Sequence, residues 1–141
     1  MKKQSGFSLL EVMVVLVIIG MILSIVAPNV MGQQEEAAKE KARLDIRQLE
    51  DAMKMYKLKN KRYPTTEQGL EALVTKTSID PVPRRFPEGG FISELPEDPW
   101  GNYYQLVSPG EMGQIDIFSM GPDGEMGTDD DIGNWDTEDE R

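Results

Sequence analysis

Hydrophobic and polar positions change their pattern once along the first sixty residues. Residues 7–27 are almost all apolar, and this run of 21 residues is long enough for a helix to cross the hydrocarbon core of a bilayer. Further on, apolar side chains recur every three or four positions among Glu, Lys, Arg and Gln, which is typical of a helix with one buried face. This stripe consists of Ala38, Ala42, Ile46, Leu49, Met53 and Tyr56. We predict one long helix over about residues 7–59, with a kink or a weak point near Pro28.

A short helix and an irregular connection are expected next. Thr65 and Gln68 are three residues apart, as in a capping box, and predict a helix start there. The apolar residues that this helix would bury are Leu70, Leu73 and Val74. Residues 81–99 contain five prolines and a Gly-Gly pair, which leave no room for a long regular element.

Two short strands are predicted in the last third of the chain. Tyr103–Val107 and Ile115–Ser119 are rich in aromatic and β-branched residues. Two or three short strands are not stable alone, so the amphipathic part of the long helix has to supply the other wall of the core. We therefore predict an α+β fold in which a long N-terminal helix packs on a small antiparallel β-sheet.

Composition excludes several classes of function. The chain has 141 residues and a net charge of −10, with +4 in residues 1–62 and −14 in residues 63–141. This acidic balance argues against nucleic acid as a partner, because nucleic-acid binding depends on cationic neutralisation of phosphates. The absence of cysteine and histidine excludes disulfides, a thiol nucleophile and ordinary zinc sites. We expect that the protein is not an enzyme. The side chains that remain as candidates for a functional site are carboxylates.

Glu11 is an ionisable side chain inside the apolar run. A charged carboxylate within a bilayer costs about 2.5–3.5 kcal/mol even on the lenient insertion scale, so it needs a partner or access to the headgroups from its place near the helix end. Lys2 and Lys3 precede the run, which leaves the N-terminus in the cytoplasm and sends the rest across the membrane. A secretory signal peptide is the alternative, but its apolar core has only about 7–15 residues, and Ile25 is too large for its cleavage pattern.

Carboxylates cluster again near the C-terminus, in "GPDGEMGTDDD". Five acidic residues fall within nine positions, and no Lys or Arg occurs between Arg85 and Arg141. They are Asp123, Glu125, Asp129, Asp130 and Asp131. Hard oxygen ligands of this kind suit calcium, although the spacing is not that of an EF-hand, because Thr128 stands where its fixed glycine should be. The alternative is a solvated acidic loop.

The sequence also resembles a known family. The leader that ends in Gly6, together with "FSLLEVMVVLVIIG", resembles the processing signal of type IV pilins and their relatives. The motifs "RYPTTEQGLEALV", "DPWGNYYQL", "DIFSMGPDG" and "DDDIGNW" resemble those of the major pseudopilins of the type II secretion system, the general secretion pathway protein G family. The resemblance runs from Lys2 to about Trp135. It implies a pilin-like structural subunit of a periplasmic filament that helps to export folded proteins across the outer membrane.

The resemblance also implies how the chain is divided and processed. Residues 1–6 would be a leader removed by the prepilin peptidase, residues 7–30 the transmembrane and assembly helix, and residues 31–141 a periplasmic globular domain. The peptidase would cut after Gly6 and methylate the new N-terminus at Phe7. Glu11 would then pair with the Phe7 amine of a neighbouring subunit in the homopolymer.

The calcium ligands and further partners follow from the same resemblance. The implied side-chain ligands are Asp123, Asp130 and Asp131, with backbone or side-chain oxygens of Met120, Glu125 and Thr128, while Asp129 faces solvent. Minor pseudopilins and the inner-membrane secretion platform are the other expected partners.

Two other functions stay open on the sequence. A type IV pilus subunit shares the N-terminal signal, but the missing C-terminal cysteine pair and the short distal domain speak against it. A membrane-tethered calcium-binding module that works as a monomer would explain the acidic cluster without a filament.

Overall fold

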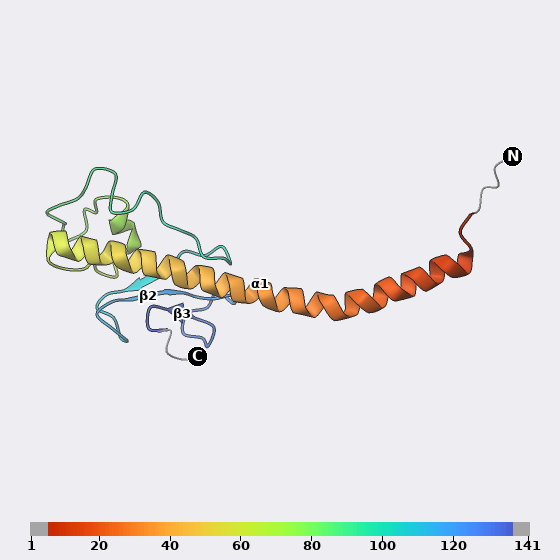
Figure 1. Cartoon of the computed structure of the whole chain (residues 1–141). Coiled ribbons are helices and arrows are strands. Elements are labelled where there is room, and N and C mark those ends of the chain that lie inside the picture. Colours follow the sequence, from red (N-terminus) through yellow and green to blue (C-terminus); the bar gives the residue numbers. More distant parts are fainter. Residues whose placement is uncertain (1–5, 137–141) are drawn as a thin grey trace. The chain divides into compact units, whose positions relative to one another are not determined.

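A computed structural model describes residues 6–136, with the backbone but not the side chains of residues 26–31 (Figure 1). The chain divides into two compact units, Met1–Ala37 and Ala38–Arg141. Its elements in chain order are the α-helix α1 (Leu9–Asn60), the 3₁₀ helix η1 (Leu70–Leu73) and the strands β1 (Gln105–Val107), β2 (Asp116–Ser119) and β3 (Ile132–Gly133).

The long helix is confirmed as one element. α1 has 52 residues, and its backbone stays helical through residue 28. At its start, the Ser8 hydroxyl accepts a hydrogen bond from the Glu11 backbone N–H at 3.1 Å, which makes Ser8 the N-cap. At its end, Lys61 adopts a left-handed φ of 66°, and the Asn60 side chain exchanges two hydrogen bonds with the backbone of Arg85.

The apolar side chains in the first part of α1 are exposed. The large apolar side chains from Leu9 to Ile25 are 46–81% exposed. Among the side chains that the structure describes, no helical stretch is both long and apolar enough to cross a bilayer. The end of the predicted span falls on residues 26–31, whose side chains lie outside the described ones. The transmembrane helix therefore stays a prediction.

The second part of α1 forms one wall of the core. Residues 42, 46, 49, 53 and 56 of the predicted stripe are all buried, while Ala38 is half-buried. They pack with buried residues of η1 and the sheet, among them Leu73, Leu106 and Ile117. Each large side chain buried in this way contributes about 1.5–3 kcal/mol to folding. All the buried core residues thus belong to the unit that begins at Ala38.

The sheet has three antiparallel strands in the order β1-β2-β3. Both predicted strands are present, although each begins later than expected, and Leu106 pairs with Ile117 at the centre of β1 and β2. β3 was not predicted; it pairs Ile132 with Ser119. The sheet lies along the C-terminal part of α1, which is yellow in Figure 1. The α+β fold with a helix packed on a small antiparallel sheet is therefore confirmed.

The capping box before η1 is confirmed in both directions. The Thr65 N–H donates to the Gln68 side-chain oxygen at 3.0 Å, and the Gln68 N–H donates to the Thr65 hydroxyl at 3.2 Å. The helix that follows is a single 3₁₀ turn, and Val74 is only half-buried. The side-chain NH2 group of Gln68 donates to the backbone carbonyls of Ile79 and Pro81. These two hydrogen bonds hold the start of the irregular connection against η1. No helix or strand forms within residues 81–99, as predicted, and Glu97 makes only an isolated bridge with Tyr103.

Two buried tyrosines of this core offer a test of the packing. The Tyr56 side chain is fully buried and its hydroxyl has no hydrogen-bond partner among the described residues, whereas the Tyr104 hydroxyl donates to Asp45 at 2.8 Å. Burial raises the pKa of Tyr56, and burial together with the Asp45 hydrogen bond raises that of Tyr104. We expect Tyr56→Phe to leave stability unchanged or raise it by up to about 1 kcal/mol, because it removes an unsatisfied donor.

The matched control is Tyr104→Phe, which removes a satisfied hydroxyl and should cost about 1–3 kcal/mol. Urea unfolding of the two variants, followed by tryptophan emission, measures both effects. A loss for Tyr56→Phe as large as that for Tyr104→Phe would show that the Tyr56 hydroxyl does find a partner.

Candidate functional site

The predicted processing site lies in the extended segment before α1. Phe7 is 83% exposed, and Gly6 is also exposed. A Cβ placed on Gly6 would meet no atom within 4 Å. Packing within the described chain therefore gives no reason for glycine at this position. If residue 6 must lack a side chain, the reason must be a contact with another protein.

Glu11 lies in the first turn of α1 with its side chain exposed. Its backbone N–H is satisfied by the Ser8 hydroxyl, but its carboxylate makes no hydrogen bond or ion pair with any residue in the described part of the chain. A negative charge in the first turn interacts favourably with the helix dipole. Ser8 was missed at the sequence level, although Ser8 and Glu11 have the three-residue spacing of a capping box.

The acidic cluster forms the loop between β2 and β3. Because Ser119 pairs with Ile132, the two ends of the loop are held side by side. The structure thus brings all six predicted ligand residues into one loop closed at its base. They are Met120, Asp123, Glu125, Thr128, Asp130 and Asp131. Asp129 is exposed, as expected.

Hydrogen bonds within the loop already occupy several of the carboxylate oxygens. Asp130 accepts from the Asp123 N–H at 3.2 Å and from the Thr128 hydroxyl at 2.6 Å. Asp123 in turn accepts from the Glu125 N–H at 2.8 Å. The hydrogen bond from Thr128 is the main reason why the pKa of Asp130 lies below its usual value. The loop therefore favours the charged form of this carboxylate.

Asp131 has one satisfied and one unsatisfied oxygen. Its Oδ2 accepts from the Gly127 N–H at 2.7 Å, while its Oδ1 is buried and finds no hydrogen-bond partner within residues 6–136. A buried carboxylate oxygen without a donor is costly, and a cation would satisfy it. Across residues 6–136, however, no three carboxylates lie close enough together to hold a metal ion. The donor chemistry of the loop suits calcium, but the three aspartates are not gathered around one point.

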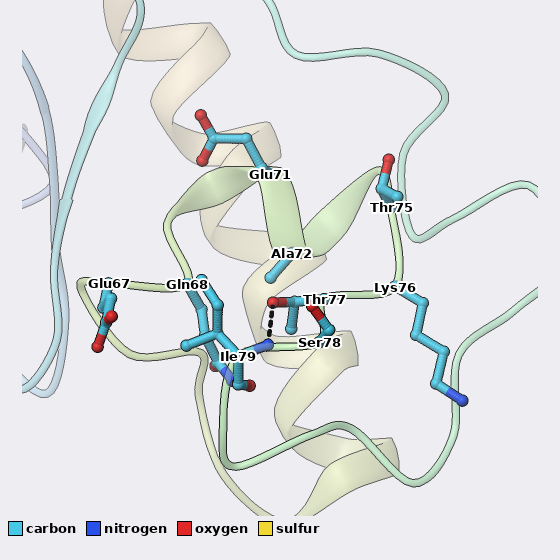
Figure 2. A pocket seen from close by; sticks show the side chains of 9 residues that line it. All are labelled: Glu67, Gln68, Glu71, Ala72, Thr75, Lys76, Thr77, Ser78 and Ile79. Carbon is cyan, nitrogen blue, oxygen red and sulfur yellow. Dashed lines mark hydrogen bonds between the residues drawn. The ribbon is translucent and has the colours of Figure 1, made fainter.

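A pocket of about 480 Å³ lies elsewhere, beside η1 (Figure 2). Ala72 and the buried Gln68 form part of its lining, and Glu67, Glu71 and Lys76 are its charged members. The Gln68 amide is already committed to the capping box and to two carbonyls. The lining also includes Thr77, whose hydroxyl accepts from the Ile79 N–H at 3.1 Å. We assign no chemistry to it.

Asn134 is a further residue that the sequence did not single out. Its side-chain oxygen accepts from the Ile117 N–H at 3.1 Å, and its side-chain amide donates to the Ile115 carbonyl at 3.0 Å. Asn134 thereby continues the pairing that β3 begins along β2. Trp135 follows and packs on Phe118 with ring centroids 5.6 Å apart. The "DIGNW" motif is therefore the segment that closes the sheet.

These features together define a pilin-like protein: a long helix whose first part carries exposed apolar side chains, an amphipathic second part, and a small sheet that carries an acidic loop. Family models agree with this class. The model for the type II secretion system (T2SS), protein G, matches residues 29–135, and that for the prokaryotic N-terminal methylation motif matches residues 1–27. The chain therefore belongs to the type II secretion system protein G family.

Individual members of this family are similar to the chain over nearly its whole length. The type II secretion system core protein G of Aeromonas hydrophila is 62% identical over 138 residues, spanning 98% of this chain and 96% of the relative. The type II secretion system core protein G of Vibrio cholerae is 57% identical, and the match spans 99% of this chain and 97% of the relative. The crystal structure of the major pseudopilin of enterohaemorrhagic Escherichia coli matches with a TM-score of 0.72 and 53% identity, over 74% of this chain and 88% of that one. This is a family of structural pseudopilins and not a family of enzymes.

Proposed function

We propose that the chain is a structural subunit of the pseudopilus of the type II secretion system and assembles with other copies through the first part of α1. The observation that carries this proposal is the exposed apolar surface from Leu9 to Ile25, beside a core that is complete without it. Large contiguous apolar surfaces are typical of contacts with lipid or with other proteins. In this protein the same surface would serve lipid before assembly and neighbouring helices afterwards.

Processing converts the precursor into the assembling form. The prepilin peptidase would cut between Gly6 and Phe7 and methylate the Phe7 amine, which frees a positive group one helical turn from Glu11. The Glu11 carboxylate, which has no partner in the described part of the chain, would then pair with the Phe7 amine of a neighbouring copy and fix the axial register of the helices. The methylation motif matched over residues 1–27 supports this step.

The proposed location follows from charge and apolarity. Before assembly the protein would cross the inner membrane once, with its N-terminus in the cytoplasm and its globular unit in the periplasm. The platform in the inner membrane would add it to the filament, and minor pseudopilins would join the same filament. The filament would help to move folded proteins toward the outer membrane.

Chemical cross-linking in membranes tests assembly directly. Cells that express the secretion system should give a ladder of dimers and higher multimers of this chain after treatment with an amine-reactive reagent. A monomeric calcium-binding module would give the monomer alone, and that result would overturn the proposal.

Calcium would complete the acidic loop. The carboxylates of Asp123, Asp130 and Asp131 would hold it, with oxygens of Met120, Glu125 and Thr128. The unsatisfied Asp131 Oδ1 supports this assignment, and the Thr128–Asp130 hydrogen bond would have to yield as the three aspartates converge. The ion would neutralise a loop that has no Lys or Arg between residues 85 and 141.

We expect removal of calcium to lower the melting temperature of the protein. A ligand that binds only the folded form contributes about 2.7 kcal/mol at 100 times its dissociation constant. Calorimetry with and without chelator measures the effect, and calcium should restore the loss far better than magnesium. Asp123→Ala should abolish the response, whereas Asp129→Ala, at the exposed neighbour, should keep it. Equal melting with and without chelator would show that the loop is only a solvated surface.

A further inference from the structure

Five exposed cations gather around the C-terminal end of α1, and we call them the basic end. They are Lys59, Lys61 and Arg62 from the end of α1 and the residues just after it, and Arg84 and Arg85 from the irregular connection. None of the five forms an ion pair with a residue in the described part of the chain, and neither do the flanking carboxylates Asp80 and Glu88. Because like charges repel, this surface favours an anionic partner.

Backbone contacts hold the two segments of the basic end side by side. The Asn60 side chain donates to the Arg85 carbonyl at 3.0 Å and accepts from the Arg85 N–H at 2.9 Å. Arg62 donates to the Val82 carbonyl at 3.4 Å. The connection contributes only backbone atoms to these hydrogen bonds, and the side chains of Arg84 and Arg85 stay exposed. Local structure therefore brings the cations together without a carboxylate among them.

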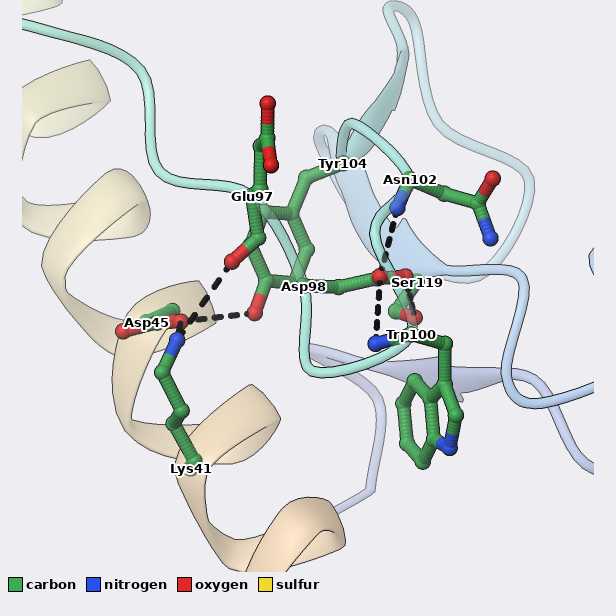
Figure 3. A network of polar contacts seen from close by, with 8 residues as sticks. All are labelled: Lys41, Asp45, Glu97, Asp98, Trp100, Asn102, Tyr104 and Ser119. Carbon is green, nitrogen blue, oxygen red and sulfur yellow. Dashed lines mark hydrogen bonds and ion pairs between the residues drawn. The ribbon is translucent and has the colours of Figure 1, made fainter.

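The acidic loop between β2 and β3 begins at the other end of the globular unit. Just before β2, Gln114 accepts from Lys57 at 2.7 Å, so this strand starts beside the last turns of α1. At the end of β2, the Ser119 hydroxyl donates to the buried Asp98 at 2.6 Å. Lys41 donates to the carbonyl just before Asp98 at 3.4 Å, on the same side of the turn (Figure 3). β2 therefore runs back along α1, from the level of Lys57 to the level of Lys41.

This arrangement separates the two charged surfaces within one copy. Residues 41 and 57 of a helix are about 24 Å apart at 1.5 Å per residue. In Figure 1 the blue loop that joins β2 and β3 accordingly lies well away from the yellow-green end of α1. Exposed charges further apart than about 10 Å are largely screened at 0.1 M salt. The basic end and the acidic loop therefore do not neutralise each other within one chain.

The acidic loop matches the basic end in charge. It contains five carboxylates, and no Lys or Arg occurs between residues 85 and 141. Within residues 6–136 these carboxylates are not gathered around one point, and Asp123, Glu125 and Asp129 are exposed. The loop therefore presents its negative charge as a surface, against which a cationic surface can lie.

We propose that the basic end of one copy contacts the acidic loop of the next copy along the filament. Every copy carries both surfaces at opposite ends of its globular unit, so the contact is head to tail and repeats without closing. Opposite charge favours this register and disfavours contacts between like ends. The inference rests on the proposed assembly of the chain. It does not depend on calcium, because one divalent ion would leave three of the five negative charges of the loop uncompensated.

A pair of introduced cysteines tests the contact, because the chain has no cysteine of its own. Val82→Cys and Met126→Cys replace exposed apolar residues beside the basic end and in the acidic loop, and leave every charge in place. In cells that express the secretion system, copper-catalysed oxidation should link the double variant into a ladder of multimers. Each single variant should stay monomeric, since residue 82 would meet residue 126 of another copy. A disulfide within one copy is excluded by distance, because bridged Cα atoms lie within about 7 Å.

Charge reversal in the double-cysteine chain tests the electrostatic origin of the contact. Arg85→Glu should reduce the multimers about threefold or more, because it replaces attraction by repulsion while its backbone bonds to Asn60 remain. Adding Asp129→Lys should restore at least about half of the loss. Lys76→Glu is the matched control: Lys76 is an exposed cation beside η1 and outside the basic end. This variant makes the same change in net charge and should keep the ladder within about twofold.

The outcomes separate this inference from the proposed function. If the double-cysteine chain stays monomeric while amine-reactive cross-linking still gives a ladder, the copies assemble without this contact and the inference alone is overturned. Dimers of either single variant, an equal loss for Lys76→Glu, or no rescue by Asp129→Lys would overturn it as well. If neither cross-linking method gives multimers, the proposed assembly falls first, and this inference falls with it.

Discussion

Glu11→Ala should enter the membrane at least as well as the wild-type chain and fail to assemble. Insertion should improve because a carboxylate that costs about 2.5–3.5 kcal/mol in the bilayer is gone. Assembly should fail because the Phe7 amine of each copy would lose its partner. Membrane fractionation measures the first effect and cross-linking in membranes the second. The two measurements should move in opposite directions.

Two further variants separate the charge of Glu11 from its place in the first turn of α1. Glu11→Gln keeps a side chain that suits the third helical position but removes the charge, and it should fail to assemble as Glu11→Ala does. Ser8→Ala removes the N-cap, at a cost of about 1 kcal/mol to the helix, but leaves the charge, and it should still assemble. Normal assembly of Glu11→Gln would mean that Glu11 acts as a helix-start residue and not as an ionic partner.

Gly6→Val should leave the precursor uncut, with Lys2 and Lys3 still attached. No atom of the described chain lies within 4 Å of a Cβ at residue 6, so the substitution should not disturb the fold, and any block must arise in the peptidase. Mass spectrometry of the membrane fraction distinguishes the precursor from a mature chain that begins at Phe7. Loss of processing should be essentially complete.

Gly20→Val is the matched control for the processing site. A Cβ at residue 20 also meets no atom within 4 Å, and valine is at least as good a helix former as glycine. This variant should be cut normally. A Gly6→Val chain that still matures to a Phe7 terminus would refute the assignment of Gly6 as the last leader residue.

Hydrophobic periodicity predicted the secondary structure correctly wherever the pattern extended over several helical turns or several residues of a strand. The stripe from Ala42 to Tyr56 predicted both the helix and its buried face, because one face of a helix has to be apolar to pack. β3 could not be found in this way. Ile132 is a single buried apolar residue between acidic and small ones, and its pairing depends on Ser119, which is far away in the sequence.

The candidate sites were predictable to a different degree. Local spacing and resemblance placed the acidic residues in one loop, whereas the pairing of Ser119 with Ile132 that closes the base of this loop was not predicted. The buried contacts of Asp98 and Asn134 were not accessible, since each joins segments about twenty residues apart through a polar side chain. A single aspartate or asparagine beside Pro or Gly is equally typical of an ordinary turn.

The contacts of Asn134 also bear on how a self-associating protein avoids misassembly. An open strand edge presents backbone donors and acceptors that pair readily with any other strand, which is a common origin of aggregation. β3 has only two residues and would leave β2 partly uncovered, but the Asn134 amide takes up the Ile117 N–H and the Ile115 carbonyl there. A subunit that meets its own copies along a filament therefore offers them fewer free backbone groups on the β3 side of β2, where another strand could otherwise pair.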